Sequence, residues 1–122
     1  MILADTSVWV DHLRKADPAL AGLLNRGQIL CHPYILGEVA LGHLRQRTVI
    51  LSALENLPQA TVARDDEVLG MIDRWALLGR GIGYVDAHLL VSISLLPGTL
   101  LWTRDQRLRK VAVALSLHTS LK

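Results

Sequence analysis

The chain has 122 residues, of which 51% are hydrophobic, and it carries a net charge of +2. Residues 1–122 therefore fit a single domain with a real core, and intrinsic disorder is excluded. The mildly basic charge is only a weak hint of a polyanionic partner. The single Cys31 excludes an intramolecular disulfide and a cysteine-rich zinc site, and its apolar surroundings predict that it is buried.

The predicted elements alternate between short apolar strands and helices. Strands are expected over residues 2–5, 28–31, 60–63 and 99–103, with a short edge strand over 116–119. Helices are expected over residues 6–14, 18–25, 33–44, 49–57, 65–78, 85–96 and 105–115. Proline after a capping residue marks two of the helix starts, at Asp17-Pro18 and His32-Pro33. This order predicts an α/β fold in which a parallel sheet of four to five strands is covered by helices on both faces.

The amino terminus and the longest uncharged run do not indicate targeting or membrane insertion. An acid at Asp5, four residues after Met1, does not fit a signal peptide. The uncharged run over 87–103 is interrupted by Pro97-Gly98, so it is interpreted as a helix followed by a strand. We therefore expect a soluble cytoplasmic protein.

Four of the eleven acids do not fit their surroundings as ordinary surface residues. Asp5 ends an apolar strand, Asp86 opens a helix with almost no polar face, and Asp105 begins the last helix just after a strand. Glu38 lies on a helix among apolar neighbours, where an unpaired carboxylate would be costly. In a parallel α/β sheet the strand-to-helix junctions lie at one edge, where ligand sites are found. We therefore expect these four carboxylates to meet in one pocket.

Four carboxylates in one pocket would repel one another unless a divalent cation neutralised them. Ligation by oxygen alone favours Mg²⁺ or Mn²⁺ over Zn²⁺. Each acid alone also has a simpler explanation, because Asp86 and Asp105 fit helix N-caps and Glu38 could pair with an arginine. It is the combination at matching junctions that favours a metal site.

Basic residues are expected to surround this pocket. Setting the four acids aside leaves seven acids against thirteen Lys and Arg, so the remaining surface is clearly basic. Four basic residues lie next to Asp105 in the sequence, namely Arg104, Arg107, Arg109 and Lys110. An acidic metal pocket with a basic rim suits a phosphodiester substrate, because the rim holds backbone phosphates while the metal acts at the scissile one. Taken singly, each basic residue is equally consistent with ordinary solubility.

Other catalytic patterns are absent or incomplete. The five histidines show no HExxH or paired spacing, so surface or capping positions are expected for them. The loop over 79–83 lacks the GxGxxG spacing and the Walker lysine, and is expected to end one helix and lead tightly into Asp86. Trp9 and Leu13 on the first helix, with the leucines of the second, offer either a groove for a partner helix or part of the core.

Four segments carry a recognisable pattern that spans essentially the whole chain. They are Ile2-Leu3-Ala4-Asp5-Thr6-Ser7-Val8-Trp9, Gly37-Glu38, Gly81-Ile82-Gly83-Tyr84-Val85-Asp86-Ala87-His88-Leu89-Leu90 and Leu101-Trp102-Thr103-Arg104-Asp105-Gln106-Arg107-Leu108. Together they resemble the PIN-domain family, and among its members the VapC-type ribonuclease toxins of bacterial toxin–antitoxin pairs. The segment around Asp86 is the most specific, whereas an isolated Asp-Thr-Ser would be a weak signal.

The resemblance implies a three-layer α/β/α fold and a Mg²⁺- or Mn²⁺-dependent endoribonuclease that cleaves RNA phosphodiester bonds. It also implies an inhibiting partner, a VapB-type antitoxin, and usually a homodimer. The family's catalytic acids map onto Asp5, Glu38, Asp86 and Asp105. Metal ligands are expected at Asp5, Asp86 and Asp105, and supporting hydroxyls at Thr6 or Ser7 and Thr103.

One position departs from the family pattern. Many PIN domains carry a further acid two positions after the fourth, and Arg107 stands there in this chain. A fully occupied second metal site is therefore not expected, and Arg107 would instead contact a substrate phosphate or an acid of the antitoxin. The alternative function is a PIN-fold nucleic-acid-binding or regulatory module without nuclease activity, and a DNA-directed nuclease is a third. The retained acids argue against an inactive domain, and the small size favours the toxin.

Overall fold

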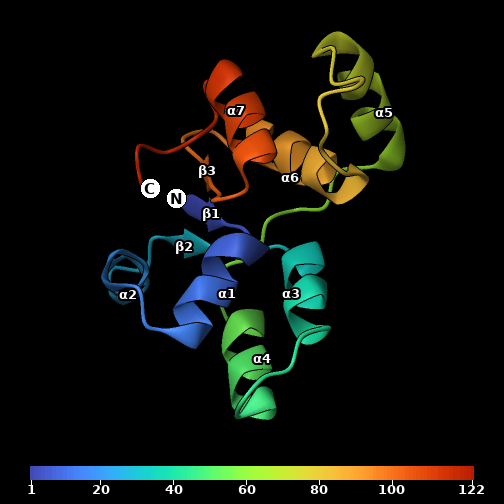
Figure 1. The fold of residues 1–122 in the computed structure, drawn as a ribbon. Coiled ribbons are helices and arrows are strands. Elements are labelled where there is room, and N and C mark those ends of the chain that lie inside the picture. The colour runs from blue at the N-terminus through green and yellow to red at the C-terminus, as the bar shows by residue number, and fades with distance from the viewer.

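The computed structural model describes residues 1–122, and a small parallel sheet lies at its centre. The strands are β1 (Ile2–Ala4), β2 (Ile29–Leu30) and β3 (Leu100–Trp102), in the order β2-β1-β3. Figure 1 shows β1 between its two neighbours. Leu3 of β1 lies opposite Leu30 on one side and Leu101 on the other. A parallel strand that is covered on both faces is apolar throughout, which explains the continuous apolar run at the start of the chain.

Seven helices surround the sheet. They are α1 (Thr6–Arg14), α2 (Pro18–Asn25), α3 (Pro33–Ala40), α4 (Arg47–Glu55), α5 (Asp65–Arg74), α6 (Tyr84–Ser94) and α7 (Gln106–Ala114). In Figure 1, α1, α3 and α4 lie on one side of the strands, and α6 and α7 lie on the other. The predicted α/β class, with helices flanking a parallel sheet, is therefore confirmed.

The sheet is smaller than the predicted four to five strands. The expected strand over 60–63 does not form, and only a single bridge between Cys31 and Gln59 marks its place. At the other edge, the expected strand over 116–119 is reduced to one bridge between Leu101 and His118. There the ladder stops because the next amide, that of Thr103, donates to the imidazole Nε2 of His118 at 3.1 Å and not to a strand carbonyl.

Two helices end four residues earlier than predicted. The helix expected over 65–78 stops at Arg74, because Ala76 adopts a left-handed conformation with φ of 51°. The Leu77 amide then donates back to the Ile72 carbonyl at 2.9 Å, which closes the helix end and buries the Leu77 side chain. The helix expected over 33–44 ends at Ala40.

The core is built around α6 and the strands. Residues 87–93 of α6 are all buried, as expected for a helix that is apolar on every side. Trp102 and Leu3 of the central strands are fully buried beside it. Cys31 is also fully buried, which confirms that it serves as a small apolar side chain. None of the seven helices combines the length and the hydropathy that crossing a lipid bilayer requires.

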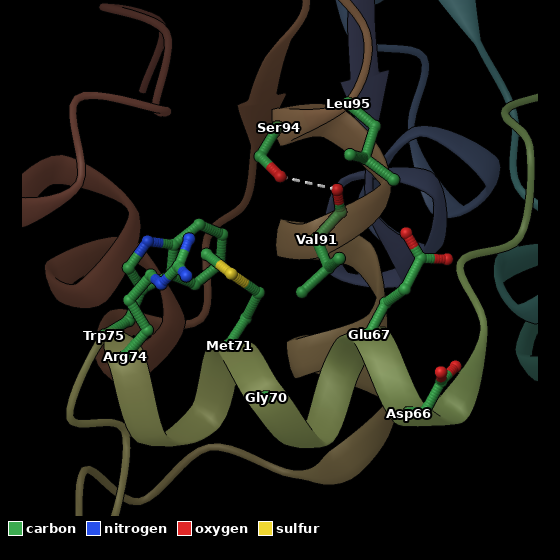
Figure 2. Close-up of a pocket in the computed structure, with 9 residues that line it drawn as sticks. All are labelled: Asp66, Glu67, Gly70, Met71, Arg74, Trp75, Val91, Ser94 and Leu95. Atoms are coloured by element: carbon green, nitrogen blue, oxygen red, sulfur yellow. Dashed lines mark hydrogen bonds between the residues drawn. The ribbon is translucent and has the colours of Figure 1, made fainter.

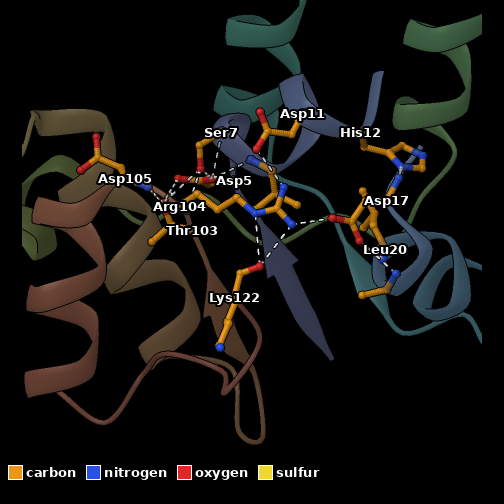
Figure 3. A network of polar contacts seen from close by, with 12 residues as sticks. Asp5, Ser7, Asp11, His12, Asp17, Leu20, Thr103, Arg104, Asp105 and Lys122 are labelled. Atoms are coloured by element: carbon orange, nitrogen blue, oxygen red, sulfur yellow. Dashed lines mark hydrogen bonds and ion pairs between the residues drawn. The ribbon is translucent and has the colours of Figure 1, made fainter. Parts of the chain in front are cut away.

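Arg104 ties the carboxyl-terminal end of the chain to the first two helices (Figure 3). Its Nη1 donates to Asp11 Oδ2 at 2.8 Å, and its Nη2 donates to Asp17 Oδ2. Its Nε donates to the main-chain oxygen of Lys122 at 3.2 Å. Asp17 also caps α2 by accepting from two amides of the first turn at 2.9 and 3.1 Å. The hydrogen bond from Arg104 is the main cause that holds the pKa of Asp17 below its usual range.

We expect Asp17→Ala to lower the free energy of unfolding at neutral pH by about 1–2 kcal/mol, because the variant loses the N-cap of α2 and a partner of Arg104. In the wild type the folded pKa of Asp17 is lowered. The stabilisation is therefore complete above the unfolded pKa of about 3.9 and is lost as the pH falls through the lower folded value. Urea denaturation at several pH values measures both effects.

Asp11→Ala is the matched control for this prediction. Asp11 also binds Arg104, but its side chain is 48% exposed and it caps no helix. We expect a loss of less than about 1 kcal/mol for this variant, as for exposed ion pairs in general. Equal losses in the two variants would contradict the capping role of Asp17.

Candidate active site

Asp5 lies at the carboxyl end of β1, where it is 5% exposed. It is the N-cap of α1, and its Oδ1 accepts from the Ser7 amide at 3.0 Å, from the Val8 amide at 3.4 Å and from the Ser7 hydroxyl. Its Oδ2 accepts from the Thr103 hydroxyl. Burial raises the pKa of Asp5, and the hydrogen bonds from Ser7, Thr103 and the two amides oppose this rise without cancelling it. The carboxylate is therefore held in one orientation, and no basic side chain neutralises it.

Thr103 connects two of the predicted acids (Figure 3). It follows β3 directly and is fully buried. Its hydroxyl donates to Asp5 and accepts from the amide of Asp105 at 3.1 Å. Asp105 is the N-cap of α7, with Oδ1 accepting from the Leu108 amide at 3.0 Å. Its cap role leaves Oδ2 without a protein donor, so the capping and ligand interpretations of Asp105 are compatible.

Asp86 lies on the first turn of α6 and is half-buried. Its Oδ2 accepts from the Gly83 amide at 3.1 Å, which forms part of the N-terminal cap of the helix. Burial is the main cause that raises the pKa of Asp86, and the Gly83 amide opposes it. The negative charges of Asp105 and Asp5 raise this pKa further. Asp86 is therefore close enough to both of these acids for their charges to act on it.

Glu38 reaches the same region from α3, but it is exposed and not buried in an apolar stripe as the sequence suggested. Its Oε1 accepts from the Thr6 hydroxyl at 2.8 Å. Thr6 follows Asp5 directly, so the hydrogen bond fixes Glu38 beside the start of α1. Each of the three predicted supporting hydroxyls thus donates to one of the predicted acids. Thr6 donates to Glu38, while Ser7 and Thr103 donate to Asp5.

The donor chemistry of this cluster suits a hard divalent cation. None of the four acids forms a salt bridge, and Asp86, Asp105 and Glu38 each keep one oxygen that accepts no hydrogen bond from the protein. As the side chains stand, no three Asp, Glu, His or Cys groups lie close enough together to hold one ion. This spacing is compatible with Mg²⁺, which is usually bound through one or two carboxylates and keeps several waters.

The basic residues around Asp105 divide into two groups. Arg104 is paired with acids of the first two helices, and Arg109 Nη1 donates to the main-chain oxygen of Leu121 at 3.2 Å. Lys110 is exposed and forms no salt bridge. Arg107 packs over the loop that leads into Asp86, where a Cβ added at Gly81 would lie 2.8 Å from its Cδ. Arg107 and Lys110 are thus the two whose charges are not used inside the protein.

The structure places His88 differently from the sequence prediction of a surface or capping position. His88 is 1% exposed, and its Nε2 lies 2.9 Å from Asp65 Oδ1. Its ring meets Tyr34 and Tyr84 edge-on. His32 caps α3, as its place before a proline suggested, but it is fully buried, and burial together with His88 lowers its pKa to about 4. The spacing of four residues between Tyr84 and His88 is the sequence signal that could have revealed this cluster.

Two hollows lie away from the acids. One, of about 530 Å³, lies between α5 and α6 and is lined by Met71, Trp75 and Val91 among others (Figure 2). The other, of about 200 Å³, lies between α1, α2 and α4 and has Trp9 and Leu13 in its wall. Neither contains any of the four predicted acids, so neither is a candidate for the catalytic centre.

We expect Thr103→Val to lower the free energy of unfolding by about 1–3 kcal/mol, because the buried Asp5 carboxylate loses a donor and the Asp105 amide loses its acceptor. The same change should raise the pKa of Asp5 further, since the Thr103 hydrogen bond lowers it. Thr103→Ser, which keeps the hydroxyl, should stay near the wild type. Chemical denaturation and an NMR titration of the Asp5 carboxyl measure the two effects. A Thr103→Val protein that matched Thr103→Ser in both would contradict the proposed role.

Comparison with known proteins gives the family. The model that describes the PIN domain matches residues 2–114, a range that includes all four acids. Two curated relatives, each named Ribonuclease VapC32 and coming from the CDC 1551 / Oshkosh and H37Rv strains of Mycobacterium tuberculosis, are 52% identical to this chain over 109 residues. The match covers 89% of this chain and 88% of each relative. The chain therefore belongs to the PIN domain family.

Proposed function

We propose that this protein is a metal-dependent endoribonuclease and the toxin component of a type II toxin–antitoxin pair. The observation that carries the proposal is the cluster of Asp5, Asp86 and Asp105, in which the charges of Asp5 and Asp105 act on Asp86 and none of the three acids has a basic partner. Such an arrangement is electrostatically unfavourable in the protein alone and becomes favourable when a divalent cation is bound. The name of the Mycobacterium relatives, Ribonuclease VapC32, supports RNA as the substrate.

Each group of the site has a role in this proposal. Mg²⁺ or Mn²⁺ bound at Asp5, Asp86 and Asp105, in part through bound waters, would supply positive charge at the scissile phosphate and activate a water. Ser7 and Thr103 keep the Asp5 carboxylate in one orientation. Glu38 or Asp105, each with a carboxylate oxygen that accepts no bond from the protein, takes the proton from the attacking water.

Binding of the RNA chain requires positive charge beside these acids. Arg107 and Lys110 are exposed and unpaired, and we assign to them contacts with backbone phosphates. Arg107 is the better placed of the two, because its side chain packs on the loop that leads into Asp86. Arg104 and Arg109 act instead by holding the end of the chain in place.

The proposed toxin function also implies partners for the protein. A VapB-type antitoxin would inhibit the enzyme, and the apolar hollow between α1, α2 and α4 is where we place an antitoxin helix. Its wall includes Trp9, Leu13, Leu24 and Ile50. We also propose that residues 1–122 form one domain and that two copies associate as a homodimer, which light scattering of the purified protein tests.

We expect Asp5→Asn and Asp86→Asn to abolish RNA cleavage while the fold is retained, because each removes a proposed ligand without changing the size of the side chain. Cleavage of single-stranded RNA in Mn²⁺ measures the loss, and circular dichroism measures the fold. Asp73→Asn is the matched control, since Asp73 is an exposed acid of α5 outside the cluster. It should cleave RNA as the wild type does.

The alternatives predict different outcomes of the same assay. A PIN-fold module that only binds nucleic acid would retain RNA without cleaving it in the wild type. A DNA-directed nuclease would cleave DNA and leave RNA intact. Full activity of either variant, or of the wild type in excess EDTA, would refute the metal mechanism.

We also expect Mn²⁺ to stabilise the folded protein directly. An ion that binds only the folded state adds roughly 2.7 kcal/mol at about a hundred times its Kd, and this appears as a rise in Tm. Most of this rise in Tm should be lost in Asp86→Asn, because the substitution removes a proposed ligand and lessens the repulsion among the acids. Differential scanning fluorimetry with and without Mn²⁺ measures the effect independently of activity. An equal rise in Tm in Asp86→Asn and the wild type would show that the ion binds outside the acid cluster.

A further inference from the structure

The only exposed aromatic side chains of this protein are its two tyrosines. The chain has three Trp, two Tyr and no Phe. Trp9 and Trp102 are buried and Trp75 is half-buried, whereas Tyr34 is 37% exposed and Tyr84 is 45% exposed. Burial is the ordinary place for large aromatic side chains, so two exposed rings in a chain with so few aromatics call for an explanation.

The two tyrosines come from different helices and meet at one buried residue. The ring centres of Tyr34 and Tyr84 lie 5.0 and 4.8 Å from that of His88, with interplanar angles of 70° and 89°. Tyr34 also meets His32 edge-on, at 5.0 Å and 67°. None of these contacts is face-to-face, so neither tyrosine is stacked on another aromatic ring of the protein.

Both rings are held in place without being covered. The Tyr84 hydroxyl donates to Asp65 Oδ1 at 2.7 Å, and the same oxygen lies 2.9 Å from His88 Nε2. The Tyr34 ring is held by its edge-on contacts with the rings of His32 and His88, which both lie in the core. A ring that is already ordered loses little conformational entropy when it binds a ligand.

The tyrosines lie on the two helices that carry predicted catalytic acids. Tyr34 precedes Glu38 by one helical turn on α3, so the two share a face of that helix. Tyr84 is the first residue of α6, and its ring contacts the same histidine, His88, as the ring of Tyr34. The pair therefore lies on the side of the molecule where α3 presents Glu38.

We propose that Tyr34 and Tyr84 form a platform on which an unpaired base of the RNA stacks next to the site of cleavage. The proposal rests on the proposed ribonuclease function and adds how the substrate is held. Base stacking on an aromatic ring tolerates any sequence, because every base has a π-face. Bases inside a duplex are already stacked on their neighbours, so such a platform selects single-stranded RNA.

Binding of a labelled single-stranded RNA to the full chain in EDTA, which prevents metal-dependent cleavage, tests the platform. We expect Tyr34→Leu and Tyr84→Leu each to weaken binding by roughly 5- to 100-fold, the range that base–aromatic stacking supplies. Tyr34→Phe is the matched control, since it keeps the ring, and it should bind as the wild type does. Tyr84→Phe should also bind, although it loses the hydrogen bond to Asp65. Fluorescence anisotropy measures all four.

A second probe does not depend on the variants folding. An RNA of the same length without bases keeps the phosphates and removes the stacking groups. The wild type should bind it at least several-fold more weakly, by the same stacking range. Equal binding of the two RNAs would overturn the platform. Leucine variants that bind base-bearing RNA as tightly as the wild type would also overturn it, even if they no longer bound a protein partner. Wild-type protein that cleaves no RNA in Mn²⁺ would instead refute the proposed function itself.

Discussion

The buried carboxylate of Asp5 is the constraint on which the arrangement of the site depends. A charge at the end of the central strand is removed from water, and burial alone would disfavour its ionised form. The chain compensates with donors from two directions, because Ser7 lies in the first turn of α1 and Thr103 follows β3. Thr103 lies 98 residues from Asp5 in the sequence, so satisfying this one carboxylate fixes the ends of β1 and β3 relative to each other.

The same hydroxyl also determines where α7 begins. Thr103 accepts from the Asp105 amide while it donates to Asp5, so the last helix starts beside the first strand. Asp86 reaches the cluster independently, on the first turn of α6. Each of the three acids caps the start of a helix, but no basic side chain offsets their charges. Burial raises the pKa of Asp86, and the charges of Asp105 and Asp5 raise it further. Arrangements that oppose stability in this way are typical of functional sites, where the local rules of folding are overridden.

The sequence predicted a structural feature correctly where the contact that determines the feature lies within a few residues. The helices α2 and α3 begin at Pro18 and Pro33 as predicted, because a capping residue and the following proline act within one turn. The prediction of a strand over 60–63 was wrong, because pairing beside β2 depends on how segments far apart in the sequence are placed. Only one bridge forms there. The acid partners of Arg104 could not be predicted, because they lie 87 and 93 residues away and no spacing in the sequence reveals them. The four acids could be proposed as a site from the sequence, since Asp5, Asp86 and Asp105 stand where a strand or loop enters a helix. The contacts of His88 depend instead on packing between three helices.

The pairing of Arg104 and Arg109 within the protein changes how RNA can be held. Each phosphate contact contributes sequence-independent affinity, and this contribution falls with salt. Two of the four basic residues beside Asp105 bind the protein's own acids and carbonyls, which leaves Arg107 and Lys110 for the substrate at this position. Two free charges beside Asp105 give only a modest electrostatic attraction at this position. Binding that does not rest on charge must then come from the bases, and the exposed, ordered rings beside the acids are the groups of this chain suited to supply it.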